Sequence, residues 1–433
     1  MKYANFDLIF LKDSFLGDSA FKRIFLSVLI LSAICMLIPA GLCASPDNQN
    51  GPSYEWMKSF SGDEKINSVW ELSDGSYVAG GHGVKGRELI FISNTGDIVS
   101  KTSIPGGDEN GSIKFVEESP TGGLYLFTDG ENLIKTDLLG NIEWTYHQPV
   151  GVISSIEVSD NGNVLMTGDF FQSFLTMISV KGEELWNKTL GTPKGGGQYR
   201  LTSVQKTPDG NFIIGGYINP IIYTENYRSF MMKTDENGEI IWSAQYSFDD
   251  SGMIISIIPL ENNNYAAALV EEKEDRIALS EDNSIYQASV FIIGNDGEEL
   301  SKIRVPTADV IYHIKAAVDG GYYLLADRYD KITDKTEYLI IRLDNKGSKL
   351  WTKNYGDVRI SSLQITSDNG LLISGTDQIT NECMIIKTSP DTAGEQKSCG
   401  FGVITAIFAG FCFVLYSAGK TQQKKIKITQ TKN

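Results

Sequence analysis

The chain has 433 residues, of which 43 are glycine, 12 are proline, 41% are hydrophobic and 10% are aromatic. This composition indicates a folded, turn-rich protein and excludes a disordered or collagen-like chain. The formal charge is −16, and residues 45–419 alone carry about −22 because the last residues, 420–433, are basic. Such an acidic surface repels phosphate backbones, so we expect no nucleic-acid partner.

Residues 1–44 have the layout of a secretory signal. Lys22 and Arg23 precede an uninterrupted run of apolar and small residues, Ile24–Ile38, and further small residues lead up to Ser45. Cleavage after Ala44 would release a mature chain that begins with a short linker, residues 45–53. The basic segment before the apolar run is long, so an uncleaved signal anchor is the alternative.

Residues 400–418 contain no charged side chain and precede a basic tail, residues 419–433. The apolar segment is long enough to cross a bilayer as a helix. Because lysines favour the cytoplasmic side, the tail is expected inside the cell and the residues before the span outside it. We therefore predict a single-pass cell-membrane protein of a prokaryotic cell, with residues 395–399 linking its extracellular part to the transmembrane helix.

A turn followed by an apolar strand recurs seven times between these two segments. The copies are 40 to 57 residues apart when they are aligned on the turn residues Gly75, Gly122, Gly162, Gly210, Asn263, Gly320 and Asn369. A second polar turn follows each strand and precedes a further strand, which often contains a tryptophan, as at Trp144, Trp186, Trp242 and Trp351. Glycine in such turns supplies the positive φ that a tight hairpin needs. The period is that of a four-stranded propeller blade.

The seventh copy has the second turn but no tryptophan strand after it. The missing strand is found at the beginning, where residues 54–60, YEWMKSF, resemble the strand that starts at Trp351. We therefore predict an all-β fold, a seven-bladed β-propeller over residues 54–394 that is closed by its N-terminal strand. Closure of this kind leaves no unpaired terminal edge.

The succession of DGGYxxxG and KTDxxGxxxW motifs resembles the repeats of exported bacterial and archaeal propellers, especially large methanogen surface proteins, and more distantly the quinoprotein propellers. Cys399, Gly400 and Phe401 resemble the archaeal Pro-Gly-Phe sorting signal, with cysteine in place of proline. This resemblance implies a fold and a location at the cell surface. It implies no substrate and no site residue.

The sequence predicts no catalytic, cofactor-binding or metal site, and no cofactor. His82, His147 and His313 lie in different repeats without a surrounding motif, and nucleophile elbows, phosphate loops and metal-ligand spacings are missing. The acidic pairs Asp249–Asp250 and Glu271–Glu272 suit solvent-exposed loops as well as weak calcium sites. Cys383 and Cys399 are the cysteines expected outside the cell, as a disulfide or as two free thiols.

Two excursions from the repeat, Glu271–Ser289 and the aromatic Tyr217–Ser229, are candidate binding loops, because long loops on a rigid scaffold tend to carry function. Asn110 and Asn187 begin glycosylation sequons. The function expected is that of a non-enzymatic cell-surface scaffold that binds an extracellular protein or glycan. The alternatives are a structural envelope or surface-layer component and an extracellular hydrolase or quinoprotein-type enzyme.

Overall fold

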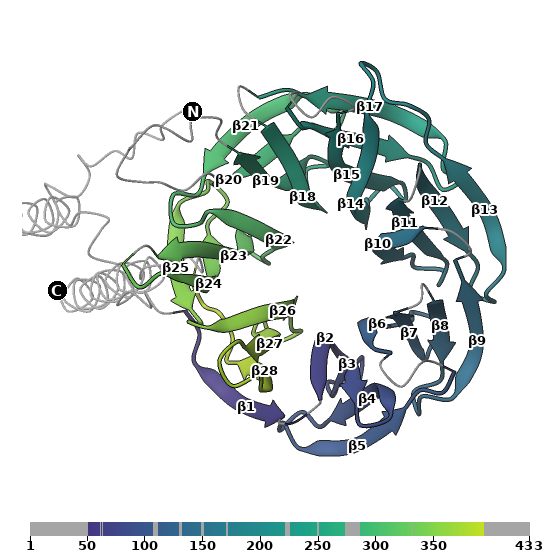
Figure 1. The fold of residues 1–433 in the computed structure, drawn as a ribbon, viewed down its shortest axis with the longest axis vertical. Coiled ribbons are helices and arrows are strands. Elements are labelled where there is room, and N and C mark those ends of the chain that lie inside the picture. The colour runs from purple at the N-terminus through teal and green to yellow at the C-terminus, as the bar shows by residue number, and fades with distance from the viewer. Residues whose placement is uncertain are drawn as a thin grey trace, which may run out of the picture. The chain divides into compact units, whose positions relative to one another are not determined.

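Seven four-stranded sheets surround a central axis in the computed structural model of the chain (Figure 1). The structure describes residues 51–393, apart from residues 61, 63, 107–110, 130–131, 149–150, 170–171, 221–225, 249–250, 273–285 and 331. The expected signal, residues 1–44, and the expected membrane span, residues 400–418, lie outside the described residues. Within the described part of the chain, no helix is long and apolar enough to cross a membrane.

Each blade is an antiparallel sheet whose strands follow one another from the centre outwards. Blade 1 contains β2 (Lys65–Glu71), β3 (Tyr77–Gly83), β4 (Gly86–Ile92) and β5 (Ile98–Ser103). Blade 2 contains β6 (Ile113–Glu118), β7 (Leu124–Thr128), β8 (Asn132–Thr136) and β9 (Ile142–His147). Blade 3 contains β10 (Val152–Val158), β11 (Val164–Asp169), β12 (Ser173–Ile178) and β13 (Glu184–Thr189). Blade 4 contains β14 (Gln198–Lys206), β15 (Phe212–Asn219), β16 (Arg228–Thr234) and β17 (Ile240–Tyr246).

The remaining blades repeat this order, except that the last one takes its outer strand from the beginning of the chain. Blade 5 contains β18 (Ser251–Pro259), β19 (Tyr265–Glu272), β20 (Tyr286–Ile293) and β21 (Glu299–Arg304). Blade 6 contains β22 (Val310–Ala316), β23 (Tyr322–Asp330), β24 (Lys335–Leu343) and β25 (Lys349–Asn354). Blade 7 contains β26 (Val358–Ile365), β27 (Leu371–Asp377), β28 (Cys383–Thr388) and β1 (Tyr54–Phe60).

The predicted seven blades and their closure by an N-terminal strand are confirmed. β1 pairs antiparallel with β28, with Trp56 opposite Lys387, so the first described strand completes the last blade. Next to this pair the Ser389 amide donates to the Ser53 carbonyl over 2.8 Å. The described chain therefore enters and leaves the propeller at the same side of blade 7.

The two sides of the ring carry different connections. On the turn face, short turns join the first strand of a blade to the second and the third to the fourth, as residues 72–76 and 93–97 do in blade 1. On the loop face lie the connections between the second and third strands and those between blades. All seven predicted turn residues have positive φ, including Asn263 (62°) and Asn369 (65°), where asparagine replaces glycine. Asparagine tolerates this conformation better than other side chains, which explains the substitution.

The KTDxxGxxxW motif is explained by one repeated contact across the third and fourth strands. A buried cation stands directly opposite a tryptophan in four blades, in the pairs Lys135–Trp144, Lys233–Trp242, Arg342–Trp351 and Lys387–Trp56. In three of them the cation also binds the aspartate of the first turn; Lys233 Nζ, for example, lies 2.6 Å from Asp209 Oδ2. Because a buried charge needs a partner, this contact joins the third strand of a blade to its first turn on the turn face.

The tryptophans also join one blade to the next. Trp144 covers the positive-φ turn glycine Gly182 of blade 3, and its indole nitrogen donates to the Val180 carbonyl over 3.0 Å. Trp186 and Trp242 make the same contacts with the following blades. Trp351 is almost completely buried, at 1% exposure, while these three tryptophans are partly buried.

Candidate functional site

The inner strands of all seven blades line a central channel. The strands β2, β6, β10, β14, β18, β22 and β26 face one another around it (Figure 1), and the cavity between them has a volume of about 470 Å³. Every inner strand contains a β-bulge at the same register position, at Asn67, Lys114, Ser154, Thr202, Ile255, Tyr312 and Ser361. The bulge adds one residue and changes the direction in which nearby side chains point.

Most hydroxyl groups near the bulge join neighbouring blades. Thr202 Oγ1 donates to the Ile254 carbonyl of the next blade over 2.8 Å, and Ser361 Oγ donates to that of Ile66 over 3.1 Å. The residue after the bulge is serine in five blades, and four of these serines accept a hydrogen bond from a backbone amide of the next blade, namely Ser68, Ser155, Ser203 and Ser256. These groups are therefore occupied by the architecture.

Blade 6 departs from this pattern, because β22 places His313 at the serine position and Lys315 two residues later. Both line the cavity and are exposed, and neither side chain has a hydrogen bond or ion pair with the described residues. The surrounding blades replace most of the bulk water around His313. This loss of solvation, helped by the charge of Lys315, lowers the pKa of His313 to about 4.

Two carboxylates lie at the same level of the inner strands as Lys315. Burial raises the pKa of Glu117 to about 8 and that of Glu157 to about 7, and Lys315 partly offsets both shifts. Glu157 accepts hydrogen bonds from the Lys206 amide and from Gln205 Nε2, each over 3.1 Å. Titratable groups from blades 2, 3 and 6 thus lie close enough to interact electrostatically, although neither glutamate lines the cavity. Sequence reasoning did not find this cluster.

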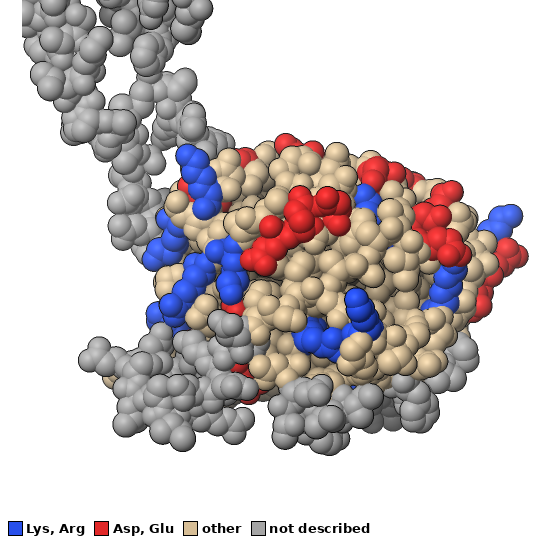
Figure 2. Space-filling model, turned by 90° about the horizontal axis from the view of Figure 1, so that it is seen from above, with Lys and Arg blue, Asp and Glu red and all other residues tan. Residues whose placement is uncertain are grey.

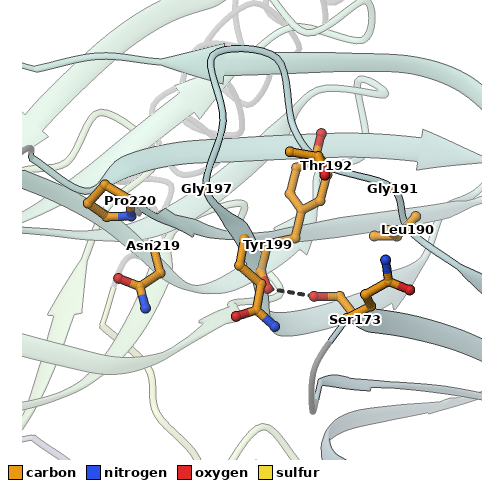
Figure 3. A pocket seen from close by; sticks show the side chains of 10 residues that line it. Ser173, Leu190, Gly191, Thr192, Gly197, Tyr199, Asn219 and Pro220 are labelled. Atoms are coloured by element: carbon orange, nitrogen blue, oxygen red, sulfur yellow. Dashed lines mark hydrogen bonds between the residues drawn. The ribbon is translucent and has the colours of Figure 1, made fainter. Parts of the chain in front are cut away.

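A second cavity opens on the loop face between blades 3 and 4 and has a volume of about 240 Å³. Figure 3 shows Ser173, Thr192, Tyr199 and Asn219 around it, together with Pro220. Its remaining lining residues are Gln172, Leu190, Gly191, Gly197 and Gln198. The lining contains amides, hydroxyls and apolar groups but no charged side chain. Such a pocket suits a neutral ligand that forms hydrogen bonds.

The wall formed by residues 190–198 depends on glycine and on one arginine. Gly195, Gly196 and Gly197 all have positive φ (84°, 80° and 98°), a backbone that other residues rarely adopt. Arg228 Nη1 donates to the Lys194 carbonyl over 3.0 Å, and its Nη2 donates to that of Gly196 over 2.7 Å. A guanidinium with several donors can hold such a loop in one conformation.

Two aromatic pairs lie near this part of blade 4, and one of them includes the lining residue Tyr199. Tyr199 meets Phe230 edge to face at 4.7 Å between ring centroids, and Tyr217 meets Tyr227 in the same way at 5.4 Å. Ser173 Oγ donates to the Tyr199 carbonyl over 2.5 Å (Figure 3). The described ends of the predicted excursion Tyr217–Ser229 therefore contribute to a preformed cavity, while Tyr223 lies outside the described residues.

The other predicted features lie apart from both cavities, except His313. His82 contacts the Gly111 carbonyl at 2.9 Å and His147 contacts Asn132 Oδ1 at 3.1 Å, in blades 1 and 2, so the histidines do not form one site. Asn187 is exposed on β13, whereas Asn110 lies outside the described residues. Cys383 is a buried free thiol, and Cys399 also lies outside the described residues. Among the described residues, no group of three or more histidine, cysteine or acidic side chains is placed to hold a metal ion.

One expectation is corrected at the Glu271–Glu272 pair, which is not part of a solvent-exposed loop. Both residues end β19, and Glu271 is only 7% exposed and pairs with Lys302 at 2.9 Å. The insertion predicted from Glu271 to Ser289 accordingly begins and ends within strands, and its central residues 273–285 lie outside the described residues, as do Asp249 and Asp250.

The surface outside these cavities is mixed in charge. Figure 2 shows acidic and basic side chains on one side of the propeller in small separate groups among uncharged residues. Several ion pairs join such groups, including Lys58–Asp97 at 3.6 Å and Lys335–Asp357 at 2.9 Å. Exposed pairs of this kind contribute little to stability and do not mark a site.

Comparison with known proteins places the chain in the class of β-propellers. A catalytically inactive virginiamycin B lyase from Staphylococcus aureus, solved with quinupristin, is similar to it with a TM-score of 0.52 and 13% identity, over 77% of this chain and 99% of that one. The WD40 β-propeller domain of Doa1 is similar with a TM-score of 0.51 and 12% identity, over 78% and 97%. At this identity the likeness concerns the fold alone.

A streptogramin B lyase structure is similar to the same degree, with a TM-score of 0.53 and 12% identity over 77% of this chain and 98% of that one. No family model matches the chain, and no curated protein matches it. The solved propellers therefore include both an enzyme and a WD40 domain, and the fold alone does not distinguish catalysis from binding.

Proposed function

We propose that the chain is a non-enzymatic, membrane-anchored propeller on the outside of a prokaryotic cell, and that it binds a glycan or a protein through its loop face. The observation that carries the proposal is the uncharged pocket between blades 3 and 4, which is built from amide and hydroxyl side chains on a fixed glycine loop. Amides and hydroxyls exchange hydrogen bonds with sugar hydroxyls, so a neutral glycan suits this pocket best.

The path of the chain supports binding through the loop face. Residues 51–53 and 389–393 both lie at the turn face of blade 7, where Ser53 and Ser389 are joined by two hydrogen bonds. The connections that approach the expected membrane segments therefore leave the ring on the turn face. The loop face lies on the opposite side of the ring from both of these connections.

A glycan array probed with the full chain in detergent tests the binding proposal. We expect at least one neutral glycan to bind, with at least a tenfold loss of affinity in Asn219→Ala and in Thr192→Ala. Asn94→Ala, which removes an exposed amide from the turn face, is the matched control and should bind as the unchanged chain does. Glycans that bind all three variants equally would show that the pocket is not the site, and an array without hits would remove the glycan assignment.

The predicted location is tested separately by intact mass spectrometry of the protein extracted from membranes of its own host. We expect a start near Ser45 and a retained basic tail, residues 419–433. A retained N-terminus would instead indicate two membrane segments. Recovery of the protein in the soluble fraction would contradict the anchor.

An enzyme acting in the channel is the second candidate function, because Glu117 and Glu157 have raised pKa values near neutrality, where acid–base catalysts operate. Incubation of each bound glycan with the full chain, followed by mass spectrometry of the glycan, separates the two functions. Unchanged glycans support a binding scaffold. Cleaved or eliminated products that disappear in the Glu117→Gln variant would support the enzyme.

A further inference from the structure

The central channel contains a cation that forms no ion pair with the described residues. Lys315 lines the cavity, and no aspartate or glutamate is among the residues that line it with Lys315. The other lining lysine, Lys114, differs because its ammonium lies 3.2 Å from Asp129. A charge in a cavity attracts a ligand of opposite sign more strongly than it would in bulk water.

The nearby carboxylates form no ion pair with Lys315 and offset its positive charge only in part. Glu117 is held largely in its neutral form near pH 7 because burial raises its pKa to about 8. Glu157 directs its carboxylate to the Lys206 amide and to Gln205, in the contact between blades 3 and 4. Both interact with Lys315 through space, but neither forms an ion pair with it among the described contacts.

Two further groups stand next to Lys315 around the ring. At the same register level, blade 7 contributes Gln364 and blade 1 contributes Trp70, so the three residues come from consecutive blades. Gln364 Oε1 accepts a hydrogen bond from the Glu71 amide over 2.7 Å. This bond fixes the side-chain amide, and its two N–H donors have no partner among the described residues. Trp70 is partly buried and also lines the cavity.

We propose that the channel is a second binding site, which takes a sugar that carries a carboxylate. Lys315 pairs with the carboxylate, Gln364 donates to a sugar oxygen, and Trp70 contacts the apolar side of the ring. A carboxylate and an ammonium form a charge-assisted hydrogen bond, and an aromatic ring gives a sugar a flat apolar surface. The site goes beyond the loop-face pocket, since it lies elsewhere in the propeller and selects a charged ligand.

The make-up of the cavity favours an acidic sugar over a small inorganic anion. A strong anion site presents several convergent donors or cations, whereas this one has Lys315 and His313 within a largely uncharged wall. Phe115 and Phe127 line the cavity as well, and its volume of about 470 Å³ leaves room for more than a single ion. Ligand pockets of this type combine apolar and aromatic walls with a few polar groups that set specificity.

Isothermal titration calorimetry on the full chain, at pH 7 and low salt, tests the proposal with D-glucuronate, D-glucose and acetate as probes. We expect glucuronate to bind at least tenfold more tightly than either glucose, which lacks the carboxylate, or acetate, which lacks the ring. Lys315→Gln should reduce glucuronate affinity at least tenfold, and Trp70→Leu should reduce it as well. Trp70→Phe keeps an aromatic ring and is the control that separates a loss of the sugar contact from a folding defect.

Two control variants distinguish the channel from the rest of the protein surface. Lys346→Gln removes an exposed lysine from the turn face and should leave glucuronate affinity unchanged. Asn219→Ala, in the loop-face pocket, should leave it unchanged as well, so the channel proposal and the loop-face proposal can fail independently.

Three results would overturn the inference. Acetate that binds as tightly as glucuronate would reduce the site to a simple anion site. Unchanged glucuronate affinity in Lys315→Gln would place any binding elsewhere. A peptide with a free C-terminal carboxylate that binds more tightly than glucuronate would reassign the channel to a protein ligand.

Discussion

The turn face and the loop face of the propeller are built by the same strands but follow opposite rules. On the turn face the connections repeat: Asp137 Oδ1 accepts hydrogen bonds from the amides of Leu139 and Asn141, and the equivalent aspartates Asp235 and Asp344 do the same in their blades. On the loop face the connections vary, from two residues between β3 and β4 to thirteen between β19 and β20. Repetition on one side maintains the fold, and variation on the other side is free to create a site.

The inner and outer strands show the same division. Five of the seven outer strands use one repeated contact, a tryptophan that covers a glycine of the next blade. Inner strands repeat the bulge but change the side chains after it, from serine to His313 in blade 6 and to Phe115 in blade 2. The departures from the repeat, rather than the repeat itself, therefore mark the places where function is expected.

The largest expected effect comes from removing residues 54–60, the strand β1. Its loss exposes the whole edge of β28 and opens the ring, so we expect the free energy of unfolding to fall by about 4 kcal/mol or more. Chemical denaturation of the full chain and of the deletion variant measures the difference. Deleting residues 275–281, an equal length between β19 and β20, is the control, and similar losses in both variants would contradict the closure model.

A smaller but still large effect is expected at the buried aspartate that ends blade 7. Asp391 has a fully buried side chain, accepts a hydrogen bond from Tyr323 Oη over 2.7 Å and lies 3.4 Å from Arg342 Nε. Asp391→Ala leaves a buried guanidinium with less compensation and should cost about 3 kcal/mol in the free energy of unfolding. Asp391→Asn keeps an acceptor for Tyr323 and should cost less. Equal losses would mean that the carboxylate charge, which both variants lack, accounts for the whole effect and that the acceptor for Tyr323 adds nothing.

Two glycine substitutions can separate the stability contributed by the contact between blades from the cost of backbone strain. Gly182 (φ 83°) and Gly75 (φ 81°) share a conformation, but a Cβ at Gly182 would lie 2.7 Å from the Trp144 ring and a Cβ at Gly75 would meet nothing within 4 Å. We expect Gly75→Ala to cost about 1 kcal/mol and Gly182→Ala about 1–2 kcal/mol more, as thermal denaturation should show. Identical melting temperatures would argue against tight packing of tryptophan on the next blade.

The smallest effect concerns pH. Because the folded pKa of Glu117 is raised to about 8 from an unfolded value of 4.5, its contribution to stability is complete below pH 4.5 and is lost as the pH rises towards 8. We therefore expect Glu117→Gln to flatten the dependence of stability on pH. Between pH 5 and pH 9, the free energy of unfolding of this variant should rise by about 1 kcal/mol relative to that of the unchanged chain. This value is smaller than the full pKa shift implies, because water in the channel screens the charge. Parallel pH profiles of the two chains would disprove the raised pKa.

The sequence was sufficient to predict the blades because their signals are local. Positive-φ positions such as Gly75 and the tryptophans that follow the second turn recur within short stretches, and the likeness of residues 54–60 to the strand at Trp351 predicted the closure. The lysine of the KTD motif was visible as well, but its position opposite a tryptophan needed the strand register.

Neither cavity could be predicted in this way, since each forms only when distant residues meet. Lys315, Gln364 and Trp70 come from three blades, and their common level around the channel follows only from the strand register. The loop-face pocket did leave one signal, the run Gly195–Gly197, whose three positive φ angles only glycine adopts readily. That run was not recognised as a candidate site.

The division between the two faces is tested most directly by hydrogen–deuterium exchange of the full chain with and without the tightest-binding neutral glycan from the array. We predict slower exchange in residues 190–199 and 215–220, which line or support the loop-face pocket, and unchanged exchange in the turns 72–76 and 207–211. Protection of those turns, with no change around the pocket, would contradict the assignment of binding to the loop face.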